Sequence, residues 1–369
     1  MKKLTKTISL LIMVALISTS FVACNNKKQV DEDIYTNDQE NESNNNQDET
    51  NTTTDENKDK DNQDTSNETE NIKDDVTIKV ATLKGPTGMG MAKLIEDVNE
   101  NNSDIKCDFT ITGSPDEIVG KVISKDVDMA CIPTNLASVL YNKTKGEIQL
   151  AAVNTLGVLY IMETGDEINS IEDLKGKEIL ASGQGKVPEY ILSYILEKNK
   201  VEDTNVNYVT EHAEVATSFI SGDSKVALLP QPFVTTATMK NKEARIAINL
   251  TEEWEKIQGE NSKLAMGCII VNKEFANNNK ELVNKFLSEY EESVNWVNNN
   301  VVDASKLIEK HEIIPKAKIA EIAIPNCNIV YINAEEAKET LSDFYQILFD
   351  FNPKSVGGKL PDGDFYFTK

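Results

Sequence analysis

The chain has 369 residues, of which 61 are acidic and 38 basic, and its net charge is −23 at pH 7. Such an acidic protein is repelled by nucleic-acid phosphates and by anionic lipid headgroups, so we exclude nucleic acid as a partner and direct electrostatic adsorption to a membrane. The sequence contains only two histidines, His212 and His311, and a single arginine, Arg245.

The first 23 residues read as an export signal. Three lysines precede a mostly apolar run over residues 8–22, which is too short to span a bilayer comfortably. Residues 21–24 resemble a bacterial lipoprotein box, with Phe21 where leucine is usual, and this resemblance implies a diacylglycerol thioether on Cys24. The alternative is a plain secretory signal followed by an incidental cysteine. We expect a lipid-anchored protein on the extracytoplasmic face of the cell membrane.

Residues 24–75 differ sharply in composition from the rest of the chain. Between residues 25 and 75 there are 17 acidic residues against five lysines, and very few apolar side chains. Such a segment buries too little surface to offset the entropy of ordering it, so we expect a disordered tether with a reach of about 40 Å. The remaining residues, 76–369, are numerous enough for two domains.

The folded part is organised around residues 78–95. A β-branched, apolar run ends in a glycine loop, and apolar residues then recur at helical spacing, which predicts a strand, a loop and a helix. Unpaired N–H groups at the start of such a helix favour an oxyanion or a carbonyl, although the glycines also suit a simple tight turn. A P-loop is excluded because Met91 stands where its lysine should be. The candidate ligand-binding residues of this loop are Lys84, Gly85, Pro86, Thr87 and Gly88.

The same pattern recurs twice in the first domain. A strand over 105–112 is followed by Ser114, whose spacing from Glu117 predicts a capping box, and a strand over 127–132 leads to a helix over 136–143. Because the loops after parallel strands gather at one edge of a sheet, we expect these loops to form a binding edge. Their candidate residues, which also suit helix caps, are Ser114, Thr134 and Asn135.

A second domain contains three further strand–loop–helix units. Strands are predicted over 178–182, 206–209 and 226–229, and each precedes a polar loop and a helix. These loops supply the second group of candidate ligand-binding residues: Gly183, Gln184, Gly185, His212, Gln231 and Phe233.

After the second domain the chain returns to the first. We expect residues 265–271 to form a strand that pairs antiparallel with residues 157–163. The expected division is a first lobe over 76–163 and 265–369, and a second lobe over 164–264. Amphipathic helices are predicted over 280–296, 304–311 and 335–351.

Four cysteines besides Cys24 lie in the folded part, and none belongs to a Cys-x-x-Cys pair. Three of them lie in apolar runs, so we expect buried thiols, no metal site and no cofactor. A disulfide stays open as an alternative for a protein outside the cytoplasm. These cysteines are Cys107, Cys131, Cys268 and Cys327.

These features together resemble an extracytoplasmic solute-binding protein of an ABC importer. The resemblance rests on the strand–loop–helix repeats, the inserted second lobe, the lipoprotein signal and the segment Ser-Ile-Glu-Asp-Leu-Lys-Gly at 170–176. The chain looks most similar to the NMT1/THI5-like receptors for nitrate, sulfonates, taurine and thiamine precursors. This implies an α/β, two-lobed type II periplasmic-binding-protein fold with two crossing hinge strands. It also implies a monomer that traps a small-molecule solute and delivers it to a membrane permease and its ATPase.

The sequence restricts the ligand without identifying it. Arg245 lies on a predicted turn away from the candidate loops, which disfavours an amino-acid ligand, because receptors for amino acids often bind the carboxylate with arginine. A small oxyanion held by helix N-termini and Lys84 is compatible with the sequence. A neutral or aromatic heterocycle that stacks on Phe233 and bonds to the side-chain amides of the loops is equally compatible.

An enzyme is the runner-up hypothesis. His212-Ala213-Glu214 matches only half of a zinc deaminase signature, and the sequence has neither a Gly-x-Ser-x-Gly elbow nor a His-Glu-x-x-His pair. We therefore expect no catalytic activity. The alternatives are an enzyme of the menaquinone-pathway type, which shares this fold but is cytoplasmic, and a surface sensor or adhesin without transport.

Overall fold

The computed structural model describes residues 76–259 and 262–369. The predicted signal, Cys24 and the tether over 24–75 lie outside these residues. Within the described ranges, no helix combines the length and the apolar character needed to cross a bilayer.

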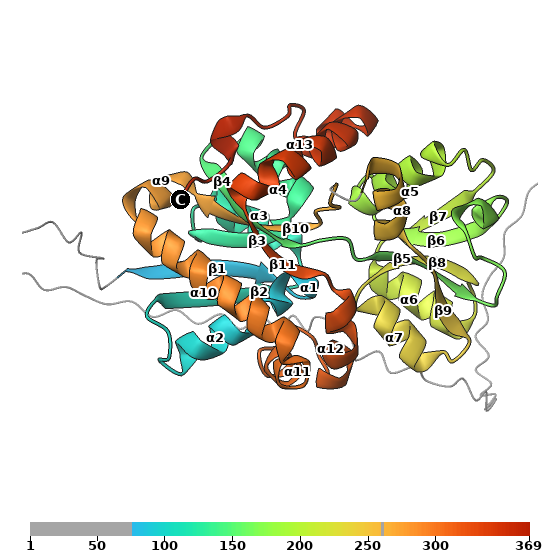
Figure 1. The fold of residues 1–369 in the computed structure, drawn as a ribbon, viewed down its shortest axis with the longest axis horizontal. Coiled ribbons are helices and arrows are strands. Elements are labelled where there is room, and N and C mark those ends of the chain that lie inside the picture. The colour runs from blue at the N-terminus through green and yellow to red at the C-terminus, as the bar shows by residue number, and fades with distance from the viewer. Residues whose placement is uncertain (1–75, 260–261) are drawn as a thin grey trace, which may run out of the picture. The chain divides into compact units, whose positions relative to one another are not determined.

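The described residues form two β-sheets, each with helices on both faces (Figure 1). We call the elements around the six-stranded sheet lobe 1 and the elements around the five-stranded sheet lobe 2. The fold is therefore α/β with two lobes, as the sequence predicted.

The sheet of lobe 1 has the strand order β11-β4-β10-β3-β1-β2. Strand β1 is parallel to β2 and β3, and β10 is antiparallel to β3 and β4. The strands are β1 (Thr77–Leu83), β2 (Lys106–Thr112), β3 (Met129–Pro133), β4 (Ile148–Thr155), β10 (Gly267–Asn272) and β11 (Ile329–Asn333). The helices of lobe 1 are α1 (Pro86–Met89), α2 (Ala92–Asn99), α3 (Pro115–Ile123), α4 (Thr134–Lys143), α9 (Lys273–Asn278), α10 (Lys280–Asn299), α11 (Val301–Lys310), α12 (Ala317–Ala323) and α13 (Ala334–Phe351).

The sheet of lobe 2 has the strand order β7-β6-β8-β5-β9. Strand β6 is parallel to β7 and β8, whereas β5 is antiparallel to β8 and β9. The strands are β5 (Leu159–Thr164), β6 (Glu178–Ser182), β7 (Asn205–Val209), β8 (Val226–Pro230) and β9 (Ala244–Asn249). The helices are α5 (Val187–Lys198), α6 (His212–Ser221), α7 (Phe233–Lys240) and α8 (Leu250–Gln258).

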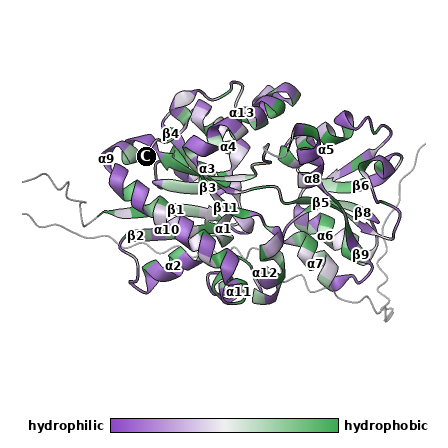
Figure 2. Ribbon diagram, viewed as in Figure 1, coloured by the Kyte–Doolittle hydropathy of each residue, from purple (hydrophilic) through white to green (hydrophobic). Residues whose placement is uncertain are grey.

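The strands are apolar because both faces of each sheet are buried. In lobe 1, Val80 and Cys131 pack with α2, α10 and α11, whereas their chain neighbours Ala81 and Ile132 pack with α3, α4 and α13. A strand covered on both sides requires this alternation, since successive side chains point to opposite faces. Figure 2 shows the corresponding pattern, with hydrophobic strands and helices that alternate between hydrophilic and hydrophobic residues.

The parallel strands of each sheet end at a common edge. In lobe 1, Leu83 is level with Thr112, and Ala81 is level with Ala130, so the loops after β1, β2 and β3 are neighbours. In lobe 2, Ser182 is level with Val209, which brings together the loops after β6 and β7. The candidate loops of each lobe therefore share one sheet edge, as expected.

The chain crosses between the lobes twice, at residues 156–158 between β4 and β5 (the first crossover) and between α8 and β10 (the second crossover). The strand pair that we expected is not formed. We expected residues 157–163 to belong to the first lobe and to pair with 265–271. Instead β5 lies in the sheet of lobe 2, and β10 lies between β3 and β4 in the sheet of lobe 1. Both strands consist mainly of apolar residues, and an apolar run does not specify which neighbour it pairs with.

The predicted strands and long helices lie within three residues of the observed bounds. Among the α-helices and strands, the sequence reading missed four short elements, namely α1, α9, α12 and β11. Helices α9 and α12 span six and seven residues, which is too short for a helical repeat to stand out. Strand β11 is a five-residue edge strand that runs directly into α13, so no loop separates its apolar residues from those of the helix.

Aromatic side chains connect helix α13 of lobe 1 to lobe 2. The ring centroids of Phe344 and Trp254 are 6.1 Å apart, and those of Phe351 and Tyr194 are 6.0 Å apart. Asn352, just after α13, donates its side-chain amide to the hydroxyl of Tyr190 at 3.0 Å. One continuous apolar cluster therefore includes residues of both lobes.

All four cysteines in the described residues are free thiols. Cys131 and Cys268 lie on neighbouring strands, but Cys131 is level with Ile269, and Cys268 is level with Ile132. The two thiols therefore point to opposite faces of the sheet and cannot form a disulfide without rearrangement of the strands.

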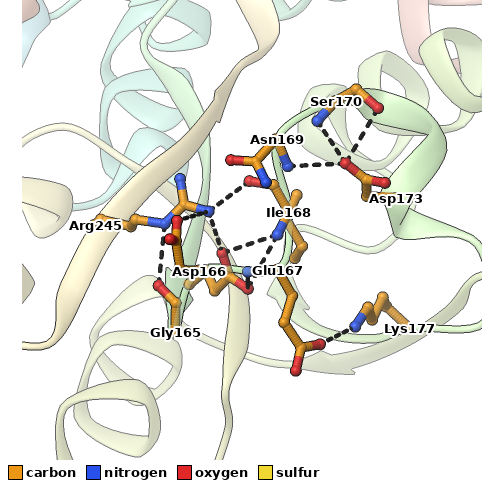
Figure 3. A network of polar contacts seen from close by, with 10 residues as sticks. Gly165, Asp166, Glu167, Ile168, Asn169, Ser170, Asp173, Lys177 and Arg245 are labelled. Carbon is orange, nitrogen blue, oxygen red and sulfur yellow. Dashed lines mark hydrogen bonds and ion pairs between the residues drawn. The ribbon is translucent and has the colours of Figure 1, made fainter.

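Arg245 organises the loop that follows β5 (Figure 3). Its guanidinium donates to the carboxylate of Glu163 at 2.7 Å and to the main-chain oxygens of Gly165 and Ile168 at 3.1 and 2.6 Å. The Glu163 side chain is only 5% exposed and also accepts hydrogen bonds from the main-chain N–H groups of Glu167 and Ile168. The single arginine of the chain is thus occupied in a structural network.

We predict that Arg245→Met lowers the free energy of unfolding by about 2–4 kcal/mol, because it leaves the buried Glu163 carboxylate without its cation. Arg245→Lys should recover only part of this loss, since an ammonium group cannot reproduce the planar fork of donors. Urea denaturation of the purified variants provides the measurement.

The matched control is Lys242→Met, a change of a cation on the exposed turn just before β9. It should alter the free energy of unfolding by no more than about 0.5 kcal/mol. Equal losses in the Arg245 and Lys242 variants would show that the network does not stabilise lobe 2.

Candidate ligand-binding site

The loop after β1 needs glycine at two positions. Gly85 has a left-handed φ of 95°, which a residue with a side chain adopts only with strain. A Cβ added at Gly88 would lie 2.3 Å from the main-chain oxygen of Leu83, so this residue allows the loop to fold back on its strand. The loop exposes the Lys84 side chain, while Pro86 and Thr87 are half-buried.

Ser114 is the N-cap residue of α3, but it does not form the capping box that we predicted. Its side chain makes no cap hydrogen bond. Instead the hydroxyl of Thr112, at the end of β2, donates to the Glu117 carboxylate and accepts the N–H of Ser114 at 3.2 Å. Thr112 lies close enough to the helix for its hydroxyl to bond to Glu117 in place of the Ser114 hydroxyl. The sequence pattern alone does not distinguish these two hydroxyl groups.

The loop after β3 is tied into the protein interior. Thr134 is 1% exposed and accepts the hydroxyl of Tyr345 on its main-chain oxygen at 2.9 Å. The side-chain amide of Asn135 donates to the main-chain oxygen of Ser355 at 3.1 Å. This amide group therefore positions the C-terminal segment, in addition to any contact with a ligand.

The loop after β6 does not present the free amides that its glycines suggested. The N–H of Gly185 donates to the Glu189 carboxylate, and its main-chain oxygen accepts the Tyr190 hydroxyl at 2.8 Å. Both Gly183 and Gly185 have positive φ angles, 83° and 71°. The loop is thus pinned by its own helix α5, and it exposes the Gln184 side chain.

His212 lies at the centre of the polar groups in lobe 2. Its Nδ1 atom is 2.6 Å from the hydroxyl of Ser182, the last residue of β6. Its ring lies 5.8 Å, centroid to centroid, from the ring of Phe233 at the start of α7. Burial, reinforced by the positive charge of Lys186, lowers the pKa of His212 to about 4. The imidazole is therefore neutral at physiological pH.

Gln231 contributes mainly to the packing around α7. Its side chain is 3% exposed, and its Oε1 atom accepts the Thr235 hydroxyl at 2.9 Å. Its main-chain N–H donates to the oxygen of Val158 at 3.0 Å. The last contact attaches the loop after β8 to the first crossover between the lobes.

Loops of both lobes are hydrogen-bonded to the crossovers. The N–H of Thr134 donates to Met266 at 3.1 Å, and the N–H of Met266 donates to Thr155 at 2.9 Å. In lobe 2, Gln231 bonds to Val158, as described above. Thr155 and Val158 are three residues apart, and an extended chain advances about 3.5 Å per residue, so these attachment points are within about 11 Å of each other. The structure thus brings together the loops after β3 and β8, which belong to different sheets.

Three residues near these loops were not candidates from the sequence. Asn154, at the end of β4, is fully buried, and its amide nitrogen lies 3.4 Å from the main-chain oxygen of Thr87. Ser182 bonds to His212, and Lys186 is exposed on the loop after β6. The available signal was a polar residue at the carboxyl end of an apolar strand, which Asn154 and Ser182 both provide.

The described residues contain no group of three or more side chains suited to holding a metal ion. A cavity of about 410 Å³ lies at the opposite edge of the lobe 1 sheet, before β3 and β4. There the Lys125 ammonium bridges the carboxylates of Glu147 and Glu274 at 3.3 and 3.5 Å. Because these exposed charges pair with one another, we assign no ligand to this cavity.

Solved structures with the same architecture define the class of fold. An ABC transporter protein from Parabacteroides distasonis aligns with a TM-score of 0.68 and 25% identity, over 80% of this chain and 100% of its own. The aliphatic sulphonate-binding protein SsuA from Escherichia coli aligns with a TM-score of 0.60 and 15% identity, over 78% of this chain and 94% of its own. SsuA from Xanthomonas axonopodis pv. citri, bound to MOPS, aligns with a TM-score of 0.56 and 14% identity, over 78% of this chain and 94% of its own. The chain therefore has the periplasmic-binding-protein fold.

The sequence profile described as NMT1/THI5 like matches residues 104–304. The chain belongs to this family, which is the group that the sequence resembled. No curated protein matches the chain in a sequence search.

We predict that His212 titrates near pH 4, far below the ordinary value of 6.5. The unfolded chain then binds a proton that the folded protein does not bind between these two values, so stability falls as the pH drops from 6.5 to 4. This effect should remove about 2 kcal/mol of stability at pH 5 and be missing in His212→Gln.

Nuclear magnetic resonance of the imidazole Cε1–H signals is the direct measurement, because the chain has only two histidines. The signal that disappears in His212→Gln identifies the residue. A midpoint near pH 6.5 for that signal would contradict the buried, neutral imidazole.

Proposed function

We propose that this protein is the substrate-binding component of an ABC importer, which captures a small solute between its two lobes and delivers it to a membrane permease. Membership of the NMT1/THI5-like family and the likeness to an ABC transporter protein and to sulfonate-binding proteins support this proposal. Proteins of this kind bind and release their solutes unchanged, so the proposal includes no catalytic step.

The observation that carries the proposal is the attachment of a loop from each lobe to one of the two neighbouring crossovers. Thr134 of lobe 1 bonds to Met266, and Gln231 of lobe 2 bonds to Val158. A ligand that touches the loops of both sheets then bridges the two lobes beside their connection. Such a ligand favours the closed arrangement by its additional contacts there, which is a population shift of the kind that periplasmic binding proteins use.

The polar groups beside these loops are compatible with two ligand classes. Lys84 and Lys186 are exposed on loops at the carboxyl edges of the two sheets and supply positive charge for a sulfonate-like oxyanion. The neutral His212 and the adjoining Phe233 ring supply a hydrogen-bonding group and an aromatic face for a small heterocycle. In both cases the ligand is small enough to lie within two opposed loop edges.

We also propose that the protein is held on the extracytoplasmic face of the membrane by lipid on Cys24, through the tether over 24–75. The basis is the lipoprotein-like signal and the acidic, apolar-poor composition that follows it. The tether lets the binding lobes reach a permease while the lipid keeps them near the membrane.

We predict that the cognate class raises the free energy of unfolding by about 2.7 kcal/mol at a hundredfold excess over its Kd. The probes are nitrate, taurine, a short alkanesulfonate and an aminopyrimidine, each followed by thermal shift and calorimetry. For an anion, Lys84→Gln should weaken binding several-fold, and added salt should weaken it further. For an aromatic heterocycle, Phe233→Ala should weaken binding about tenfold without salt dependence.

Lys143→Gln is the control for charge, because this exposed lysine lies at the end of α4, which runs away from the candidate loops. It should leave both affinities unchanged. Small-angle scattering with the bound probe tests lobe closure. A probe that raises the melting temperature without compacting the protein would contradict the hinge mechanism.

We predict that Cys24→Ala releases the protein from the membrane fraction of its host, since the substituted residue cannot accept a thioether-linked lipid. The measurement is immunoblotting of membrane and soluble fractions, together with mass spectrometry of the mature N-terminus. Unchanged membrane retention of the Cys24→Ala protein would contradict lipid anchoring and would favour another means of attachment.

A further inference from the structure

The first crossover, residues 156–158, is hydrogen-bonded to both lobes. Its bonds go to lobe 1 at residues 156 and 157 and to lobe 2 at residue 158. Asn328 of lobe 1 accepts the N–H of Leu156 on its main-chain oxygen at 3.0 Å, and its side-chain amide donates to the oxygen of Gly157. The next oxygen, that of Val158, accepts the N–H of Gln231 from lobe 2 at 3.0 Å. The backbone up to Gly157 is therefore fixed to lobe 1, and the backbone from Val158 onward is fixed to lobe 2.

Asn328 is suited to this clasp by its own conformation. Its φ of 44° lies in the left-handed region, where asparagine is among the few residues with a side chain that are tolerated. This conformation lets one residue use its main-chain oxygen and its side-chain amide on two successive residues of the crossover.

Gly157 also contacts the first turn of α8 in lobe 2. A Cβ added at Gly157 would lie 2.0 Å from the Oγ1 atom of Thr251, 3.0 Å from its Cβ and 3.1 Å from its Cγ2. The overlap is severe at Oγ1, whereas the approaches to Cβ and Cγ2 are tight and require shifts of only a few tenths of an ångström. The absence of a side chain at Gly157 thus sets how closely lobe 2 approaches the crossover.

The second crossover changes sides in a comparable way. Ser262 accepts the indole N–H of Trp254 at 3.1 Å, so it is still attached to α8 of lobe 2. Met266 is bonded to Thr155 and Thr134 of lobe 1. The second crossover therefore passes from lobe 2 to lobe 1 between residues 262 and 266. Met266 is bonded to Thr155, the residue just before the first crossover.

We propose that lobe 2 turns about the main-chain torsions at the Gly157–Val158 linkage, with Asn328 as the positioning residue that holds the fixed end and the Gly157–Thr251 contact as the stop. This inference rests on the proposed lobe closure and assigns it a pivot. At this linkage the carbonyl group of Gly157 is bonded to lobe 1, and the next carbonyl group, that of Val158, is bonded to lobe 2.

The test uses the full-length protein with Gly157→Ala, which inserts a wedge between the crossover and α8. Spin labels on ketone-bearing amino acids encoded at the exposed positions 143 and 202 report the distance between the lobes by pulsed electron resonance. We expect the mean distance in the unliganded protein to shift by a few ångströms. We also expect the affinity for the cognate probe to change at least fivefold, because the inserted methyl group alters the free-energy difference between the open and closed forms.

The matched suppressor is Gly157→Ala combined with Thr251→Ala, which removes the Oγ1 and Cγ2 atoms that the new methyl group meets. It should return both the distance and the affinity toward the wild-type values. A variant that is merely misfolded would not be rescued by a second truncation. Asn328→Gly keeps the left-handed backbone accessible and removes only the side-chain donor. It should broaden the distance distribution while the melting temperature stays within a few degrees.

The outcomes separate this inference from the proposed function. If the probe closes the wild-type protein and Gly157→Ala leaves the distances and the affinity unchanged, the pivot lies elsewhere and the receptor function stands. If no probe alters the distance in the wild type, lobe closure itself is wrong. An unrescued shift in the double variant would also overturn the role of Thr251 as the stop.

Discussion

Two strand registers determine where the candidate loops of this protein lie. Thr155 at the carboxyl end of β4 is level with Gly267, and Leu159 at the start of β5 is level with Pro230 at the end of β8. Three residues, 156–158, therefore lead from the loop edge of one sheet to the loop edge of the other. A slip of one residue in either register would move every side chain of the strand to the opposite face, where it would meet a different set of helices, so the packing on both faces fixes this register. The site depends first on backbone pairing and only then on the side chains of the loops.

The chemistry available beside the loops is largely dipolar, apart from the lysines and the carboxylates of Glu117 and Glu189, which bond to loop residues. Several groups that suit a ligand are already used within the protein: the Gly185 N–H by Glu189, the Asn135 amide by Ser355 and the Gln231 amide by Thr235. These bonds fix the loops before any ligand arrives, which reduces the entropy lost on binding. The neutral imidazole of His212 belongs to the same design, because a buried charge without a partner would cost several kcal/mol.

The sequence predicted the two-lobed α/β fold, the family and nearly every strand, because hydrophobic periodicity and glycine loops are local signals. It did not predict the strands that pair with β5, because the sequence of a mainly apolar strand buried on both faces does not indicate which strands lie beside it. Ser114 and Thr112 show a similar limit at the level of side chains: both hydroxyls lie close enough to cap α3, and only the three-dimensional geometry shows that Thr112 bonds to Glu117. Asn328 was not a candidate because its contacts lie about 170 residues away along the chain.

The aromatic contacts of α13 restrict how the lobes can move. Separation of Phe344 from Trp254 and of Phe351 from Tyr194 would expose large apolar rings and lose contacts of about 0.5–1.5 kcal/mol each beyond their buried area. Open and closed forms of a receptor differ by only a few kcal/mol, so a rotation that breaks this cluster is too costly. An axis that passes close to both the crossovers and this cluster leaves the aromatic rings in contact. The same rotation changes the separation on the other face of the lobe 2 sheet, where α7 approaches α12. On closure, the distance between α7 and α12 should therefore change more than the distances near the axis.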